Sequence, residues 1–187
     1  MNVYDFDQTI YDGDSTFHFI GFCLKKKPSL IFPLSIGVGT FVLYLFHQRT
    51  KTQSKEKFFA MFQKIERIDD WVEAFWDGHI HRIKAWYLEQ KQPDDLIISA
   101  SPAFLLRPAC RRLGIKHLEA SRVDRRTGKY TGINCYGEEK VRRFKESYTG
   151  EIDAFYSDSV SDLPLARIAK AAFLVEGEKC FVWKTED

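Results

Sequence analysis

Five short apolar runs recur along the chain and set the strongest limit on its fold. They cover residues 2–7, 95–101, 117–123, 154–158 and 171–175. Runs that are apolar on both faces are typical of strands buried inside a parallel sheet. Helical patterns separate them at 102–113, 138–147 and 163–169. This alternation predicts an α/β fold with a doubly wound, Rossmann-like parallel sheet.

Local signals mark where some of these elements end. Ser101 stands in the cap position before the helical pattern 102–113, and Gly114 follows its last residue. Pro108 lies inside the pattern, so we expect the helix to kink or shorten there. Residues 124–135 contain the run Arg-Thr-Gly-Lys-Tyr-Thr-Gly, which predicts a small β-hairpin.

A long insertion, roughly residues 13–90, separates the first strand from the second. An ordinary crossover needs only about a dozen residues. Aromatic residues recur at spacings of three and four, as in Phe59 and Phe62 or Trp71 and Phe75, and indicate amphipathic helices. We therefore expect a catalytic core of residues 1–12 and 91–187, with a helical cap of residues 13–90 over the carboxyl ends of the strands.

Composition narrows the class of protein. The 187 residues carry a formal net charge of only +2, so charge gives no reason to expect a nucleic-acid partner. The first residues lack a basic segment followed by an apolar one, so we expect a cytoplasmic protein. The cysteines are scattered without a CxxC pair, which favours reduced thiols over disulfides or a zinc site. They are Cys23, Cys110, Cys135 and Cys180.

Acidic residues follow two of the predicted strands. The first group is Asp5-Phe6-Asp7-Gln8-Thr9, and the second places Asp158 and Asp162 four residues apart. Hard oxygen ligands from two strand ends suit Mg²⁺, which binds few protein carboxylates and keeps positions for phosphate oxygens. Ser99 closes a third strand, and Lys140 lies near a predicted helix start. Each of these residues has an ordinary structural explanation when taken alone; Asp162, for example, could be only a helix cap.

Phosphoryl transfer gives these residue types a common purpose. Negative charge spreads over the oxygens of the transferring group, so catalysis depends on positioning and on charge stabilisation. A carboxylate nucleophile divides the reaction into two displacements, and a second carboxylate can move the protons. A lysine, a hydroxyl and Mg²⁺ would hold the phosphoryl oxygens.

The ordered set Asp5-x-Asp7-x-Thr9, Ser99, Lys140 and Asp158-x-x-x-Asp162 resembles the haloacid dehalogenase superfamily, in the branch (subfamily IB) whose helical cap follows the first strand. The resemblance spans almost the whole chain. It implies that Asp5 is the nucleophile, Asp7 the general acid and base, and Thr9 the residue that fixes the loop. It implies that Asp5, Asp7, Asp158 and Asp162 surround Mg²⁺, with the main-chain carbonyl of Asp7 as a ligand and Asp162 partnering a metal-bound water or the lysine.

Within that branch the chain is similar to phosphoserine phosphatases and to C-type phosphatidylglycerophosphatases. The former read the serine amino group with a glutamate, and the equivalent position here is Asp14, which could equally cap a helix. We therefore expect a phosphomonoester substrate, with a lipid phosphate such as phosphatidylglycerophosphate ahead of phosphoserine. The substrate-binding residues implied are Asp14, Ser99, Ala100 and Lys140.

An uncharged segment at 29–46 bears on that choice. Lysines at 25–27 precede it, and Arg49 and Lys51 follow it. A single membrane span is excluded, because it would separate Asp5 from Asp158 across the bilayer. The segment is then part of the cap core, an oligomer contact, or an element lying against an anionic membrane through residues 25–51, at the inner face. The oligomeric state stays open.

Two other classes of protein gather similar residues. A signalling receiver domain also places aspartates, a lysine and Mg²⁺ around an aspartyl-phosphate, but its acceptor follows the third strand and it has no long insertion after the first. A catalytically silent binding module is the second alternative. A phosphotransferase, in which an alcohol replaces water, also stays open. His79 and His81 differ by two positions on a predicted helix and face different ways, so they do not suggest a metal site.

Overall fold

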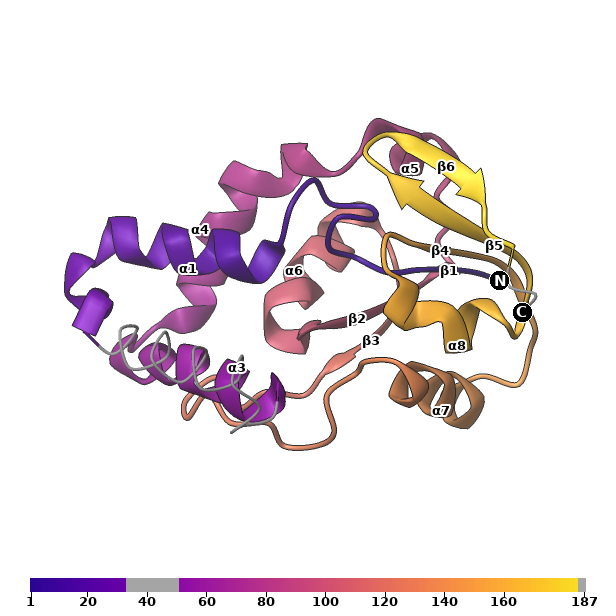
Figure 1. Cartoon of the computed structure of the whole chain (residues 1–187). Coiled ribbons are helices and arrows are strands. Elements are labelled where there is room, and N and C mark those ends of the chain that lie inside the picture. Colours follow the sequence, from indigo (N-terminus) through magenta and orange to yellow (C-terminus); the bar gives the residue numbers. More distant parts are fainter. Residues whose placement is uncertain (33–50, 185–187) are drawn as a thin grey trace.

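The computed structural model describes residues 1–32 and 51–184, with a sheet at one end of the molecule and the helices of the insertion at the other (Figure 1). The strands of the described chain form one six-stranded sheet. They are β1 (Asn2–Tyr4), β2 (Leu96–Pro102), β3 (His117–Ser121), β4 (Ile152–Ser157), β5 (Ala169–Glu176) and β6 (Lys179–Val182).

The strand order is β3-β2-β1-β4-β5-β6, and β1 to β5 pair in parallel as predicted. The expectation of a purely parallel sheet is wrong at one edge, where β6 pairs antiparallel with β5. Gly177 makes the tight turn between them with φ of 59°, a conformation that favours glycine. All four residues of β6 are exposed, although Cys180, Phe181 and Val182 are apolar.

Side chains alternate between two hydrophobic layers, one on each face of the sheet. Val3 points to the layer beneath α7 (Glu138–Ser147) and α8 (Leu163–Ala166). Tyr4 points to the opposite layer, which contains α6 (Ala103–Leu113) and the helices of the insertion. Helices therefore cover both faces, and the doubly wound α/β prediction is confirmed.

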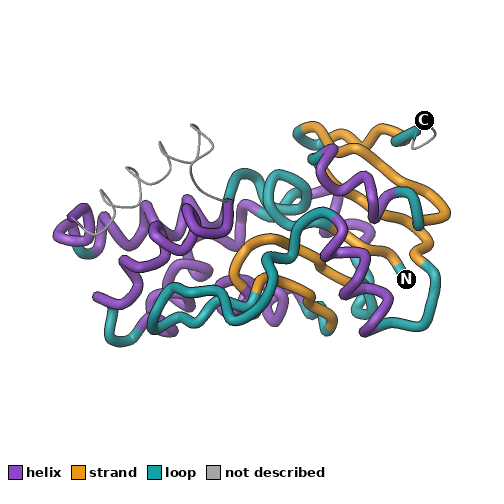
Figure 2. Tube along the Cα trace, turned by 60° about the horizontal axis from the view of Figure 1, so that its bottom comes forward, coloured by secondary structure: helices purple, strands orange, loops and turns teal. Residues whose placement is uncertain are grey.

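Helices joined by short turns make up most of the described insertion (Figure 2). Its longest helices are amphipathic, and Trp76 of α4 donates a hydrogen bond to the carbonyl of Leu105 in α6, at 2.6 Å. The insertion and the sheet therefore share one apolar layer. The division into a core of 1–12 and 91–187 and a cap of 13–90 stays a prediction. The helices are α1 (Ser15–Lys26), η1 (Pro28–Leu30), α3 (Lys51–Phe59), η2 (Ala60–Lys64), α4 (Ile68–His79), η3 (Ile80–Arg82) and α5 (Ala85–Gln90).

Three local expectations need correction. Helix α6 continues through Pro108 to Leu113, so the proline does not shorten it. Ser101 belongs to β2 and does not cap α6, whose N-cap is Pro102. The loop between β3 and α7 contains only a single bridge, between Val123 and Tyr130, in place of a regular hairpin.

The segment 29–46, for which membrane contact was considered, lies largely outside the described residues. In its described part, Ile31 and Phe32 are exposed. No helix in the described part of the chain combines the length and the apolar character that crossing a bilayer requires.

Candidate active site

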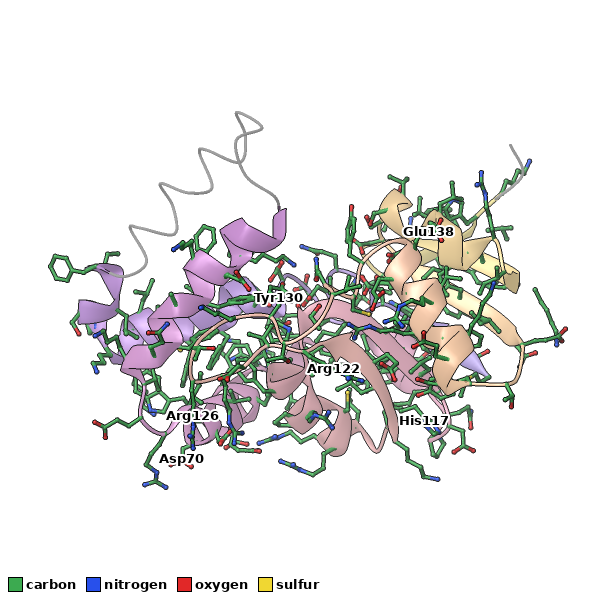
Figure 3. The ribbon with its side chains drawn as sticks, turned by 90° about the horizontal axis from the view of Figure 1, so that it is seen from below. Asp70, His117, Arg122, Arg126, Tyr130 and Glu138 are labelled. Atoms are coloured by element: carbon green, nitrogen blue, oxygen red, sulfur yellow. The ribbon has the colours of Figure 1, made fainter. Side chains whose placement is uncertain are left out.

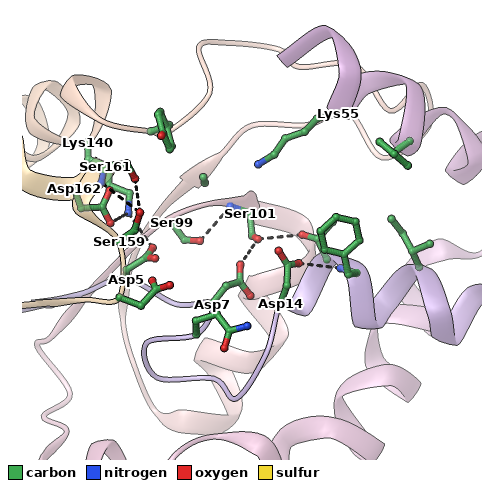
Figure 4. A pocket seen from close by; sticks show the side chains of 18 of the residues that line it. Asp5, Asp7, Asp14, Lys55, Ser99, Ser101, Lys140, Ser159, Ser161 and Asp162 are labelled. Carbon is green, nitrogen blue, oxygen red and sulfur yellow. Dashed lines mark hydrogen bonds and ion pairs between the residues drawn. The ribbon is translucent and has the colours of Figure 1, made fainter. Parts of the chain in front are cut away.

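The carboxyl ends of β1, β2 and β4 meet at one edge of the sheet and form the floor of a cavity of about 260 Å³ (Figure 4). This edge lies where the strand order reverses between β1 and β4, the usual ligand site of such sheets. The Asp5 amide donates to the carbonyl of Tyr156, at 2.9 Å, and so aligns the loop after β1 with that after β4. The predicted residues that line the cavity are Asp5, Asp7, Asp14, Ser99, Ala100, Lys140, Asp158 and Asp162.

Lys140 lies at the centre of the charge network. Its ammonium nitrogen is 2.9 Å from a carboxylate oxygen of Asp5 and 2.7 Å from one of Asp162, and only 2% of the side chain is exposed. Burial alone lowers the pKa of Lys140, but the two carboxylates outweigh this effect and raise the pKa above its usual range. Lys140 therefore stays a cation beside Asp5, where it can stabilise phosphoryl oxygens.

Asp162 holds Lys140 in place. One carboxylate oxygen accepts from the Lys140 ammonium and from the Ser157 hydroxyl, both at 2.7 Å. The side chain makes no capping hydrogen bond to α8, so the structural alternative of an N-cap is not what the geometry shows. Its other oxygen is buried without a hydrogen-bond partner in the described structure.

Asp7 is oriented by two serines. The Ser15 amide donates to one carboxylate oxygen at 2.6 Å, and the Ser101 hydroxyl donates to the other at 2.5 Å. Because Ser101 gives its proton to Asp7, the Thr16 hydroxyl, 3.0 Å away, is left to donate to Ser101. Burial is the main cause that raises the pKa of Asp7 to about 6, the charge of Asp14 adds to it, and the two serines oppose it. A pKa near neutrality suits a residue that gives and takes a proton.

Thr9 does not reach the cavity. It is fully buried, its hydroxyl donates to a carboxylate oxygen of Asp158 at 3.2 Å, and the Asp158 amide donates back at 3.0 Å. Thr9 thus joins the loop after β1 to the loop after β4.

Asp14 has the alternative role that its position suggested. Its carboxylate accepts from the amide of Phe17 at 2.9 Å and caps α1. It still borders the cavity, but one of its oxygens is occupied by the helix.

The donor set can be tested for its fit to Mg²⁺. Among the described residues, no three His, Cys, Asp or Glu side chains converge closely enough to bind a metal by themselves. Mg²⁺ commonly takes one or two carboxylates and fills its remaining positions with water and phosphate oxygens. Asp5 and Asp158 border the same cavity and supply that number, with one oxygen of each already accepting from Lys140 or Thr9. Both oxygens of Asp7 accept from serines, and one oxygen of Asp162 has no partner in the described structure. The oxygens present fit a hard divalent cation.

Sequence reasoning missed several residues near the cavity. Ser101 was assigned to a helix cap, although a second polar residue at the end of an apolar strand was a usable signal. Lys55 extends its ammonium group from α3 towards the cavity (Figure 4). Other lysines stand close to it in the sequence, so nothing in the sequence singled it out. Lys84 is buried, and burial lowers its pKa while nearby acidic groups, Glu178 foremost, oppose that shift.

His79 is half-buried. Its ring stacks on that of Phe75 with centroids 4.2 Å apart, and its Nδ1 pairs with the Phe75 carbonyl. His81 is exposed, so the two histidines do not form a pair.

Comparison with known proteins gives limited but consistent results. A protein named "Probable phosphatase" from Mycobacterium tuberculosis is 35% identical over 94 residues, which cover 46% of this chain and 33% of that protein. A histidinol-phosphatase from Neisseria meningitidis is 32% identical over 88 residues, 40% of each chain. The chain therefore spans less than half the length of these relatives.

Solved structures share the fold. A protein of unknown function from Bordetella pertussis superimposes with a TM-score of 0.72 at 20% identity, over 92% of this chain and 87% of that one. A phosphoserine phosphohydrolase-like protein from Francisella tularensis gives a TM-score of 0.58 at 16% identity, over 92% and 86%. The model of the haloacid dehalogenase-like hydrolase family matches residues 3–167. This chain therefore belongs to the haloacid dehalogenase-like hydrolases.

Proposed function

We propose that this protein is a Mg²⁺-dependent phosphatase that transfers the phosphoryl group of a phosphomonoester to Asp5 and then to water. The observation that carries the proposal is the position of Asp5. Its carboxylate borders the cavity, lies 2.9 Å from the buried cation of Lys140, and shares the cavity with the serine-bound carboxyl of Asp7. A nucleophile, a cation and a proton carrier thus line one small space.

In the first step the Asp5 carboxylate oxygen forms a bond to phosphorus as the bond to the leaving oxygen breaks. Asp7 gives its proton to that oxygen, so the product leaves as a neutral alcohol. In the second step Asp7 takes a proton from water, the water oxygen bonds to phosphorus, and the bond from phosphorus to Asp5 breaks. Lys140 and the Ser99 hydroxyl contact phosphoryl oxygens throughout. Mg²⁺, when bound by Asp5, Asp158 and the Asp7 carbonyl, supplies positive charge to the phosphoryl oxygens.

The cavity wall favours a substrate with an apolar part. On the side of the insertion the wall contains four apolar side chains beside Asp14, Thr16 and the cation of Lys55. Asp14 is partly used as a helix cap, which weakens it as a reader of an amino group. These features support a lipid phosphate over phosphoserine. The apolar residues are Phe17, Ile20, Phe58 and Phe59.

The related histidinol-phosphatase supplies a second small-molecule candidate, histidinol phosphate, which belongs in the same substrate panel. Contact with an anionic membrane through residues 25–51 remains part of the lipid proposal. Flotation with phosphatidylglycerol vesicles tests it, and the absence of protein from the floating fraction removes that support.

Phosphate release by wild type and Asp5→Asn tests the mechanism, with phosphatidylglycerophosphate in mixed micelles, phosphoserine, histidinol phosphate and an aryl phosphate as substrates. We expect release that requires Mg²⁺ and is lost in D5N, whose folding is checked by its melting temperature. Surface variant D153N is the matched control and should keep full activity. Release by D5N at the wild-type rate would exclude Asp5 as nucleophile. Absence of release by wild type, together with no binding of beryllium fluoride, would exclude the phosphatase.

A further inference from the structure

The last residues of the insertion run alongside the loop that follows β1. Arg82 donates through Nε to the carbonyl of Asp12 at 2.9 Å, and the Asp12 amide donates back to the carbonyl of Arg82, also at 2.9 Å. The Lys84 amide donates to the carbonyl of Ile10 at 2.8 Å. This clasp, defined by Arg82 and Lys84, therefore fixes alternate carbonyls of the catalytic loop.

The side chain of Lys84 extends the clasp to a third carbonyl. Only 4% of Lys84 is exposed, and its ammonium donates to the carbonyl of Gln8 at 2.5 Å and to that of Gly177 at 2.6 Å. Both acceptors are neutral main-chain groups. Burying a cation that has no directly bonded carboxylate costs folding free energy. We therefore expect one of the contacts of Lys84 to serve the structure.

Gln8, which accepts from Lys84, has an unusual main-chain conformation. It is the sole non-glycine residue of the described chain with a positive φ, 58°, and it lies between Asp7 and Thr9. A side chain in this left-handed region costs free energy and persists only when its surroundings hold it. The Gln8 amide donates to the carbonyl of Gly13 at 2.9 Å, and the Gln8 carbonyl accepts a hydrogen bond from the Lys84 ammonium. Both sides of the strained residue are thus fixed.

We propose that Lys84 is a positioning residue for phosphoryl transfer, because its ammonium holds the left-handed turn at Gln8 and thereby aims Asp7 into the cavity and Thr9 at Asp158. The inference rests on the proposed phosphatase function. Lys84 does not line the cavity, so it acts through the catalytic loop. Its bond to Gly177 also joins that loop to the turn between β5 and β6.

Variant Lys84→Met keeps the aliphatic stem and removes the donors. We expect kcat to fall roughly tenfold to a hundredfold, as for loss of hydrogen bonds from a charged group. KM should change little, because no cavity residue is altered. The matched control is Lys91→Met, since Lys91 also donates to a main-chain carbonyl, that of Leu113 at 2.8 Å, far from the cavity. K91M should keep the wild-type kcat, and Lys84→Arg, which keeps charge and donors, should recover most of it.

A second measurement separates positioning from simple loss of stability. Beryllium fluoride binding, followed by fluorine NMR with Mg²⁺ present, reports the acyl-phosphate geometry of Asp5 without turnover. K84M should bind it at least about tenfold more weakly at a temperature where the variant is fully folded. If K84M does not fold, Lys84→Gln, which keeps one donor group without the charge, takes its place in both measurements.

A wild-type kcat and wild-type beryllium fluoride binding in K84M would overturn the inference. So would a loss of kcat that K91M shares, or one that K84R fails to recover. These outcomes leave the proposed function intact, because that depends on turnover by wild type and its loss in D5N.

Discussion

Thr9 contributes no atom to the cavity wall, yet its hydroxyl makes two hydrogen bonds with Asp158 across the ends of two strands. It is fully buried, so neither bond can be replaced by water. We therefore propose that Thr9 helps to set the position of Asp158 relative to Asp5.

Variant Thr9→Val keeps the shape of Thr9 and removes the hydroxyl. We expect the free energy of unfolding to fall by about 1–3 kcal/mol because the Asp158 amide loses its acceptor. Activity should fall roughly tenfold as Asp158 loses its anchor. Urea denaturation and phosphate release measure the two effects. Thr9→Ser restores the hydroxyl and should behave nearly as wild type; equal losses in both variants would show that the methyl group matters instead.

Among individual residues, the sequence predicted those that belong to a motif with regular spacing. Asp5, Asp158 and Ser99 come together because the carboxyl ends of neighbouring parallel strands share an edge, and Lys140 reaches them from the first turn of α7. Lys84 has no such signal, since its partners are main-chain carbonyls far away in the sequence. The catalytic roles of Asp5, Asp158, Ser99 and Lys140 remain predictions.

Helix α7 shows how an element orients the side chain of Lys140, for which we propose a catalytic role. Glu139 accepts from Arg143 at 2.8 Å, and Arg143 donates onward to the carbonyls of Ala120 at 2.7 Å and Ile133 at 2.6 Å. These bonds join the first turn of the helix to β3 and to the loop beyond it. Lys140 is the next residue along, so the ion pair sets the direction from which its ammonium enters the cavity.

The ion pairs of Glu139 predict an acid dependence of stability. Hydrogen bonds from Arg142 are the main cause that lowers the pKa of Glu139 from 4.5 to about 2, burial opposes it, and Arg143 adds to it. Below pH 4.5 the unfolded chain takes up this proton while the folded chain resists until about pH 2. The stability that Glu139 contributes is therefore complete above pH 4.5 and is lost as the pH falls towards 2.

We expect wild type to exceed Glu139→Gln in free energy of unfolding at pH 6, and the gap to close between pH 4.5 and 2. Urea denaturation at stepped pH measures it. Glu146→Gln is the control, since Glu146 is exposed on the same helix and, among the described residues, pairs with Arg142 alone. A gap that stays constant down to pH 2.5 would contradict the assignment.

Element prediction succeeded where apolar patterning was strong. The helix at 138–147 matches α7 residue for residue, because its period is clear and glycine precedes it. Strand β6 was missed although three of its four residues are apolar, because so short a run gives a weak strand signal and the strand forms by pairing with β5. Ser101 was misassigned because a serine before a helical pattern resembles a cap, whereas the register shift between Ser99 and Pro102 keeps it in the strand.

Across the whole molecule, the apolar layer on one face of the sheet continues into the insertion. Trp76 is fully buried there. The centroid of its ring is 5.8 Å from that of Phe6 and 5.5 Å from that of Tyr11. Because the insertion and the sheet share this layer, neither part can lose its packing alone. We therefore expect them to unfold together.

Variant Trp76→Ala tests this coupling. We expect a loss of about 3–5 kcal/mol from the cavity created, with a further cost at the Leu105 carbonyl left without its donor. Far-ultraviolet and near-ultraviolet circular dichroism should give one coincident transition in both proteins. Leu88→Ala, at a half-exposed position, is the control and should cost far less. Two separate transitions in wild type would show that the insertion unfolds independently.

Metal binding should also be visible in the stability of the whole chain. A ligand that binds only the folded state stabilises it by about 2.7 kcal/mol at a concentration one hundred times its Kd. We expect Mg²⁺ to raise the melting temperature of wild type and EDTA to reverse the rise. Asp158→Asn should abolish the shift, while D153N keeps it. A full shift in D158N would remove Asp158 from the proposed ligands.

The loop from β3 to α7 passes beneath the insertion, with Arg126 and Tyr130 on its course (Figure 3). At Gly128 it comes so close to Phe59 that an added Cβ would lie 2.4 Å from the main chain there. Tyr130 donates its amide to Glu56, at 2.9 Å. The loop therefore supports the aromatic wall of the cavity from behind while contributing none of the acidic residues.

The loop that supports the aromatic wall is thus separate from the acidic residues of the cavity, and this has an evolutionary consequence. Insertions, deletions or substitutions in residues 124–131 can reshape the wall at Phe59 while the residues that handle phosphate stay unchanged. Gly128 is the exception, since any side chain there would collide with the insertion. Changes in this loop are therefore expected to alter substrate preference more than the reaction itself, whereas a side chain at Gly128 would require the main chain at Phe59 to move.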